Sequence, residues 1–244
     1  MNYRPALNIP PVVKNLILAN VVLFVITVVM EQMGTNLYTV LGLFFPLSEK
    51  FRLHQLFTHM FMHGNIGHIF FNMFALYMFG RVLESVWGPK RFLTFFLVTG
   101  LGAAALHSFV NFIEYKSVVS QMSPEQVAYV KEVGSSIWSE SKNFSDPLMS
   151  KLNILLNTPT VGASGAVFGI LLGFGMLFPN TELMLLFPPI PIKAKYFVIG
   201  YGALELYLGF SNSGGNIAHF AHLGGMLFGY FMIVYWRKNS KNFY

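Results

Sequence analysis

A serine between glycines opens one of the apolar segments of this chain, where its hydroxyl is placed for nucleophilic chemistry. Ser164 lies in the run TVGASGAVFG over residues 160–169. Glycines allow close approach to the backbone, and the first turn of a helix exposes unpaired N–H groups with a partial positive charge. Such a position can stabilise an oxyanion beside the serine. The alternative is that Ser164 is one small residue of a helix-packing surface, the usual role of serine in a membrane helix.

His68 and Asn72 form a second polar group inside an apolar segment. They are four positions apart, so both side chains lie on one face of a helix. A neutral imidazole and a carboxamide each carry an N–H donor, and two donors aimed at one point can bind a developing negative oxygen. The alternative is an ordinary interhelical hydrogen bond, worth about 0.6–2 kcal/mol in a membrane.

His222 opens another apolar segment and is followed by regularly spaced glycines, as Ser164 is. These glycines are Gly225 and Gly229 after His222, and Gly165, Gly169 and Gly173 after Ser164. Small residues four apart let two membrane helices pack closely. If the two segments pack there, the serine and the histidine meet near one end, because both helices start from the same side. A serine beside a histidine base is the minimum for nucleophilic acyl transfer.

No aspartate accompanies this pair. The only acidic residue deep in an apolar segment is Glu205, and the sequence does not place it near His222. A two-residue dyad of serine and histidine is therefore the economical interpretation. We expect Glu205 to make an interhelical hydrogen bond or to line a water-filled cleft.

The composition is that of an integral membrane protein. The 244 residues are 54% hydrophobic and 11% charged, with a mean hydropathy of +0.55. The chain has no cysteine, which excludes disulfides, thiolate metal sites and a cysteine nucleophile. Its first apolar segment lacks the pattern of a cleaved signal peptide, so we expect it to be a retained span.

Six apolar stretches approach the roughly 20 residues that cross a bilayer. We therefore expect a single all-α membrane domain over 1–244, with six transmembrane helices at about 15–32, 66–86, 91–113, 161–178, 195–211 and 216–236. Residues 33–65 form an outer loop whose apolar part lies in the interface, because it is too short to cross. Residues 114–158 form a soluble outer insertion, in which a capping box at Ser123 predicts a surface helix.

The distribution of basic residues predicts the orientation. The short outer loop carries two, Lys50 and Arg52. The ten in the segments expected inside are Arg4, Lys14, Arg81, Lys90, Arg91, Lys193, Lys195, Arg237, Lys238 and Lys241. By the positive-inside rule both termini are cytoplasmic. The formal charge of +6 therefore requires no nucleic acid as a partner.

Together these motifs resemble the rhomboid family of intramembrane serine proteases, over nearly all of the chain. The run GASG at 162–165 is similar to the family's nucleophile motif Gly-x-Ser-Gly, and Ala221-His222 with its two glycines is similar to the motif that supplies the base. The resemblance implies a six-helix rhomboid-like bundle. It also implies that His68, Asn72 and the Ser164 amide bind the oxyanion.

The resemblance has departures. His54-Gln55 stands where many members carry Trp-Arg, which leaves the anchoring of the first outer loop open. Phe168 stands where some members carry tyrosine, so packing on His222 is expected without a hydroxyl. The insertion at 114–158 is longer than the family pattern and lies on the catalytic side, where we expect it to regulate substrate access. His59 and His63 are implied to support the outer loop.

The resemblance further implies an endopeptidase that cuts membrane-anchored proteins near the outer end of a transmembrane segment, through an acyl-enzyme. No cofactor and no metal are expected, the lipid bilayer is the surrounding partner, and the oligomeric state stays open. Six spans without an organelle-targeting presequence predict a multi-pass protein of the bacterial inner membrane, with its site open to the outer side.

Two other classes stay open. One is a metal-dependent membrane enzyme or transporter, although the His-Glu-x-x-His motif is absent. Its candidate ligands are His59, His63, His68, His219, His222 and Glu205. The other is an inactive rhomboid-like protein that only binds membrane helices.

Overall fold

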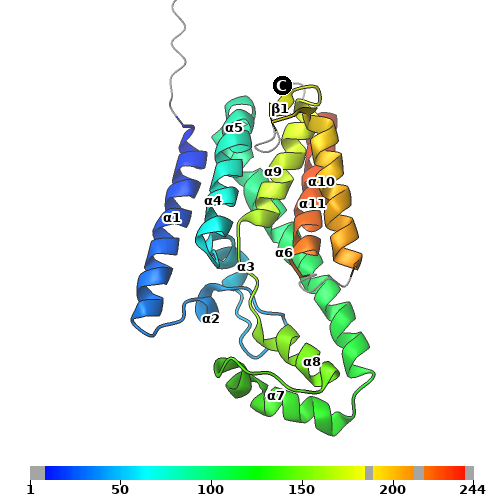
Figure 1. Cartoon of the computed structure of the whole chain (residues 1–244). Helices are drawn as coiled ribbons and strands as arrows, with labels where there is room; N and C mark the ends of the chain where they lie inside the picture. Colours follow the sequence, from blue (N-terminus) through cyan, green and yellow to red (C-terminus); the bar gives the residue numbers. More distant parts are fainter. Residues whose placement is uncertain (1–8, 185–188, 212–216, 240–244) are drawn as a thin grey trace, which may run out of the picture.

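The structure, a computed structural model, describes residues 9–184, 189–211 and 217–239. Within them six helical segments form a bundle (Figure 1). They are α1 (Pro11–Gln32), the continuous run of α4 (Ile66–Ala75), η2 (Leu76–Gly80) and α5 (Arg81–Trp87), α6 (Pro89–Val119), α9 (Ser164–Leu177), α10 (Ala194–Phe210) and α11 (Ile217–Asn239). These bounds follow the six apolar stretches, and the expectation of an all-α bundle is confirmed.

Short elements connect the helices of the bundle. The chain between α1 and α4 contains α2 (Tyr38–Leu41), α3 (Gln55–Thr58) and the single turn η1 (His59–Phe61). Strands β1 (Glu182–Met184) and β2 (Pro191–Lys193) pair antiparallel between α9 and α10, with Glu182 opposite Lys193. The sequence did not predict this hairpin.

The helices differ in how well they suit a bilayer. α1, the run from α4 to α5, and α6 are long and apolar enough to cross. α9 is apolar throughout but has 14 residues, about 21 Å of helix against a hydrocarbon core of about 30 Å. The outer faces of the bundle expose large apolar side chains, among them Leu18, Val25, Phe71, Ile199, Tyr207 and Phe210. Six complete crossings stay a prediction.

The short helix α9 lies at the centre of the bundle and packs against α4, α6, α10 and α11. Its buried face contacts a core rich in aromatic rings, in which Phe92, Phe95 and Phe96 are fully buried. Its first residue, Ser164, is half-buried, whereas most of the helix that follows is buried.

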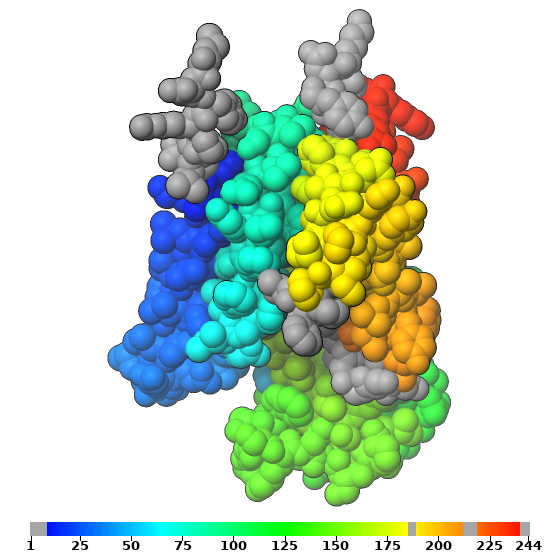
Figure 2. All heavy atoms as spheres, turned by 45° about the horizontal axis from the view of Figure 1, so that its top comes forward, coloured from blue at the N-terminus to red at the C-terminus, as the bar shows by residue number. Residues whose placement is uncertain are grey.

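The insertion between α6 and α9 is a packed pair of helices, α7 (Pro124–Ser139) and α8 (Pro147–Asn157). It lies beyond the end of the bundle at which α9 and α11 begin (Figures 1 and 2). The predicted capping box is present, because Ser123 Oγ accepts from the Gln126 N–H at 3.3 Å and Gln126 Oε1 accepts from the Ser123 N–H at 3.0 Å. Helix α6 continues to Val119, past the residue at which the insertion is expected to begin; the insertion's bounds of 114–158 stay a prediction.

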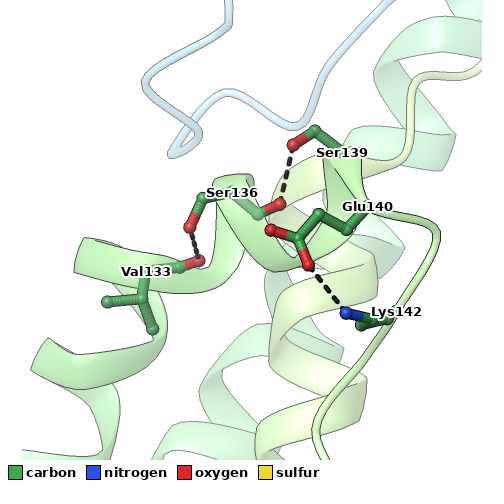
Figure 3. A network of polar contacts seen from close by, with 5 residues as sticks. All are labelled: Val133, Ser136, Ser139, Glu140 and Lys142. Atoms are coloured by element: carbon green, nitrogen blue, oxygen red, sulfur yellow. Dashed lines mark hydrogen bonds and ion pairs between the residues drawn. The ribbon is translucent and has the colours of Figure 1, made fainter.

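Helix α7 ends in a short polar network (Figure 3). The hydroxyl of Ser136 donates to the Val133 carbonyl, and the hydroxyl of Ser139 donates to the Ser136 carbonyl. Glu140 and Lys142 form an exposed ion pair at 2.9 Å.

The sequence did not predict α8, although its start has a typical signal. Asp146 precedes Pro147, and its carboxylate accepts a hydrogen bond from the Met149 N–H at 2.9 Å. An aspartate at the N-cap followed by proline at the first helical position favours a helix start.

A buried carboxylate joins the start of α1 to α5. Glu84 is 2% exposed and accepts hydrogen bonds from the backbone N–H groups of Val12 at 2.9 Å and Val13 at 2.8 Å. These are donors of the first helical turn that have no partner within their own helix. The negative charge also complements the positive end of the helix.

We expect Glu84→Ala to lower the free energy of unfolding by about 1.5–3 kcal/mol, because it leaves two buried donors without a charged acceptor. Thermal unfolding in detergent measures the effect, and Glu31→Ala, at an exposed position of α1, is the matched control. Equal midpoints for the two variants would contradict this role of Glu84.

Candidate active site

Glycines bring α9 and α11 into backbone contact. A methyl group added at Gly225 would overlap the Gly165 carbonyl group. One added at Gly169 would lie 3.0 Å from the Gly225 carbonyl oxygen, and one at Gly229 would lie 3.4 Å from the Gly169 Cα. The predicted packing of the two glycine-bearing segments is therefore confirmed. Both helices start at the same end of the bundle (Figure 1).

The turn before α9 places Ser164 beside His68. Gly162 has φ +128°, a conformation that side chains rarely adopt, and its N–H donates to the His59 carbonyl at 2.9 Å. A Cβ at Gly162 would lie 2.7 Å from His68 Nε2 and 3.5 Å from Ser164 Oγ. The imidazole thus covers Gly162, two residues before the serine. Glycine is needed here for both the backbone conformation and the space.

Phe168 holds the ring of His222. The two rings are stacked, with centroids 4.0 Å apart and planes 5° apart. Phe168 follows Ser164 by four residues, so the two side chains share one face of α9. His222 therefore lies against the face that carries Ser164. The expected ring packing without a tyrosine hydroxyl is confirmed.

Glu205 lies where the sequence did not place it. Its side chain is buried, and Oε2 accepts a hydrogen bond from His219 Nδ1 at 2.6 Å. His222 Nδ1 lies 3.0 Å from the same oxygen, at an angle outside a well-aligned hydrogen bond. The expected interhelical hydrogen bond is thus confirmed. The signal for this cluster was the spacing of three between His219 and His222, which puts both rings on the side of α11 that faces α10.

His68 and Asn72 lie on α4 as expected. Asn65 caps this helix through a 2.8 Å hydrogen bond from the His68 N–H to its Oδ1. The Asn72 amide is buried and donates to the His68 carbonyl at 3.1 Å. The structure brings the His68 ring next to Ser164. It shows the Asn72 amide bonded within its own helix, which leaves one amide hydrogen for another acceptor.

The first outer loop is held by Gln55, which with His54 stands where many members of the family carry Trp-Arg. Gln55 is fully buried, and its Oε1 accepts from the backbone N–H groups of Phe44 at 3.3 Å and Arg52 at 3.0 Å. His54 Nε2 lies 2.8 Å from the Val40 carbonyl oxygen. The Gln55 carbonyl in turn contacts His59 Nδ1 at 2.8 Å. The loop is therefore anchored by His54 and Gln55, the residues that stand in place of the family's Trp-Arg pair.

His59 and His63 are buried residues of the same loop. Burial lowers the pKa of each to about 4, and the neighbouring His68 contributes to the shift at His63. The ring of His63 is packed edge-on against that of His68, with centroids 4.9 Å apart. Both histidines are therefore neutral at neutral pH, which fits a supporting role for them.

A polar cluster beside the Ser164 cavity was not predicted. His107 of α6 is buried, with Nε2 2.8 Å from Thr160 Oγ1 and 3.1 Å from Asn111 Nδ2. Together with Ser164 and Ala221 it lines a cavity of about 30 Å³, enough for one water molecule. The spacing of four between His107 and Asn111 was the only signal in the sequence.

Glu205, His219 and His222 are the described residues whose donor atoms cluster most like a metal site, within 4.8 Å of one another. Their separations of 2.6 and 3.0 Å are hydrogen-bond lengths. Two ligands of a tetrahedral zinc ion lie about 3.3 Å apart. The observed distances therefore fit hydrogen bonds between the carboxylate and the two imidazoles better than ligation of a metal ion.

The two buried histidines predict a loss of stability in acid. The unfolded chain takes up protons at His59 and His63 near pH 6.5, whereas the folded chain does so only near pH 4. Their contribution to stability is therefore complete above about pH 6.5 and falls as the pH drops toward 4. Thermal unfolding in detergent at about pH 7.5 and about pH 5 measures this loss.

His63→Gln should reduce the difference between the two pH values, whereas the same change at the exposed His54 should leave it as in the wild type. A melting temperature that is equal at both pH values in the wild type would contradict the assignment.

Comparisons with known proteins identify the family. The Rhomboid domain model matches residues 50–239. RHOMBOID-like protein 12, mitochondrial, of Arabidopsis thaliana is 34% identical over 219 residues, 88% of this chain and 55% of the relative. Rhomboid protein 1, mitochondrial, of Saccharomyces cerevisiae is 25% identical, over 69% of this chain and 38% of the relative. Rhomboid protease AarA of Providencia stuartii is 26% identical, over 70% of this chain and 51% of the relative.

The chain spans about half the length or less of these relatives. Two of the three are named as mitochondrial, so they give no support to the expected bacterial inner membrane. The family is one of membrane proteins and includes proteases. With a family model that matches most of its length, this chain belongs to the rhomboid family.

Proposed function

We propose that this chain is an intramembrane serine endopeptidase that uses Ser164 as nucleophile and His222 as base. The observation that carries the proposal is the stack of His222 on Phe168, one turn after Ser164 on the same face of α9. The His68 ring against Gly162 supports it, because it places an imidazole nitrogen in the turn that precedes the serine.

In this mechanism His222 takes the hydroxyl proton of Ser164 while Oγ bonds to the peptide carbonyl carbon. The Ser164 amide, His68 and Asn72 donate to the oxyanion that forms. His222 then returns the proton to the leaving amine, and an acyl-enzyme remains. Water hydrolyses this ester by the same route. The cavity beside Ser164 and His107 is large enough to hold one such water.

The short length of α9 supports a substrate inside the membrane. With about 21 Å of helix in a core of about 30 Å, Ser164 lies below the membrane surface when the far end of α9 reaches the other side. We propose that the substrates are membrane-anchored proteins cut near the outer end of a transmembrane segment. A helical peptide bond is shielded by its own hydrogen bonds, so the segment must unwind locally first.

The placement of the insertion supports a role in access. The pair α7–α8 lies beyond the end of the bundle that holds the site (Figure 2), and we propose that it regulates how substrates reach Ser164. In this proposal the opposite end of the bundle, where α1 begins and α11 ends, lies on the cytoplasmic side.

Cleavage of a panel of reporter transmembrane segments in liposomes tests the function. We expect the wild type to cut some of them, and Ser164→Ala and His222→Ala to be slower by at least about 10³-fold. A fluorophosphonate should label the wild type at Ser164 with or without a chelator.

The matched serine variant is Ser85→Ala. Ser85 is an exposed residue of α5 whose hydroxyl donates to the Arg81 carbonyl of its own helix, so its loss should leave cleavage as in the wild type. Wild-type cleavage by Ser164→Ala would contradict the proposal. Loss of wild-type activity on chelation would favour the metal-dependent class instead.

A further inference from the structure

A buried carboxylate in contact with the proposed base has no part in a two-residue dyad. Glu205 is 6% exposed, and its neighbours along α10, Leu204 and Leu206, are exposed on the outer face of the bundle. The carboxylate thus points inward, on the side of α10 that also carries the buried Val198 and Gly209. An ionisable group at this depth is costly unless it has partners, and its partners are His219 and His222.

The contacts define which imidazole nitrogen carries a proton. Glu205 Oε2 faces Nδ1 of both histidines, and an ionised carboxylate only accepts hydrogen bonds. With a hydrogen on Nδ1, the Nε2 atom of neutral His222 keeps a free lone pair, as a base requires. The 3.0 Å contact is poorly aligned in the free enzyme, a common state for hydrogen bonds that tighten when a substrate binds.

We infer that Glu205 is a positioning residue that holds the Nδ1 hydrogen of His222 and stabilises the imidazolium formed when His222 takes the proton of Ser164. This inference rests on the proposed function. It extends the dyad to a triad of serine, histidine and glutamate. The glutamate comes from α10 and touches no substrate.

His219 shares the same oxygen and moderates this effect. Its hydrogen bond to Glu205 is the shorter of the two contacts, at 2.6 Å. The hydrogen that His219 donates to Oε2 partly neutralises the negative charge of that oxygen, so the charge attracts His222 less strongly. The same hydrogen bond also fixes the rotation of the carboxylate.

Other titratable groups lie near the base on the neighbouring helices α4, α6 and α10. They are His68 of α4, whose ring lies against Gly162, His107 of α6 beside the Ser164 cavity, and Tyr201 of α10, whose ring contacts Phe168. α9 carries no charged residue. Glu205 is therefore the group among these that favours a positive charge on His222.

The pH dependence of fluorophosphonate labelling tests the inference without a substrate. In this reaction Ser164 Oγ bonds to phosphorus, the P–F bond breaks to release fluoride, and the hydroxyl proton passes to His222 Nε2. The rate rises with pH as His222 loses its proton. A negative neighbour favours the protonated ring, so its removal should move the midpoint of this rise to lower pH.

We expect Glu205→Gln to slow labelling at neutral pH by about 10- to 10³-fold and to lower the midpoint, and Glu205→Asp to restore part of both. Glu84→Gln removes a buried carboxylate far from the site, on α5, and should keep the wild-type midpoint. His219→Ala leaves the whole carboxylate to His222 and should raise the midpoint, which gives a second test if Glu205→Gln folds poorly.

The outcomes separate the two proposals. A wild-type midpoint in both Glu205→Gln and His219→Ala overturns the positioning role, even if the rate falls, because a purely structural role changes the rate alone. The proposed function survives that result as long as Ser164→Ala and His222→Ala stay unlabelled. Wild-type labelling of His222→Ala would instead overturn the proposed function.

Discussion

The backbone contact between α9 and α11 is the interaction on which the rest of the site depends. Lipid tails are as apolar as the helices, so the association of membrane helices relies on close packing rather than on the hydrophobic effect. Gly165 and Gly225 meet without side chains between them. The first turns of both helices therefore lie side by side, and the His222 ring fits against Phe168.

A second constraint is that each polar group in this apolar bundle needs a partner, because an unpaired one is costly at low dielectric. The Gly162 N–H donates to the His59 carbonyl, and Glu205 joins α10 to α11.

The parts that the sequence predicted follow from local rules. Glycines four apart indicated the α9–α11 contact, since spacing alone defines a groove on a helix. The capping box at Ser123 indicated the start of α7 for a similar reason, because its donors and acceptors lie within four residues. The expected helix bounds were close because the length of an apolar stretch is a property of the chain itself.

The features of the structure that the sequence did not predict depend on how one helix or loop is oriented relative to another. The rotation of α10 about its axis decides whether Glu205 faces lipid or His222, and nothing in the α10 sequence defines that rotation. The contact of His107 with Thr160 joins α6 to a loop 53 residues later. The β1–β2 hairpin consists of strands of three residues, too short to show a period.

The rate at which a fluorophosphonate labels Ser164 in Gly225→Ala tests the central claim most directly. The added methyl group would overlap the Gly165 carbonyl and force α9 and α11 apart. We predict labelling at least about 10²-fold slower than in the wild type, as for a small misplacement of catalytic groups. Gly200→Ala, where an added methyl meets no atom within 4 Å, should label as the wild type does. Equal rates for both variants and the wild type would contradict the account.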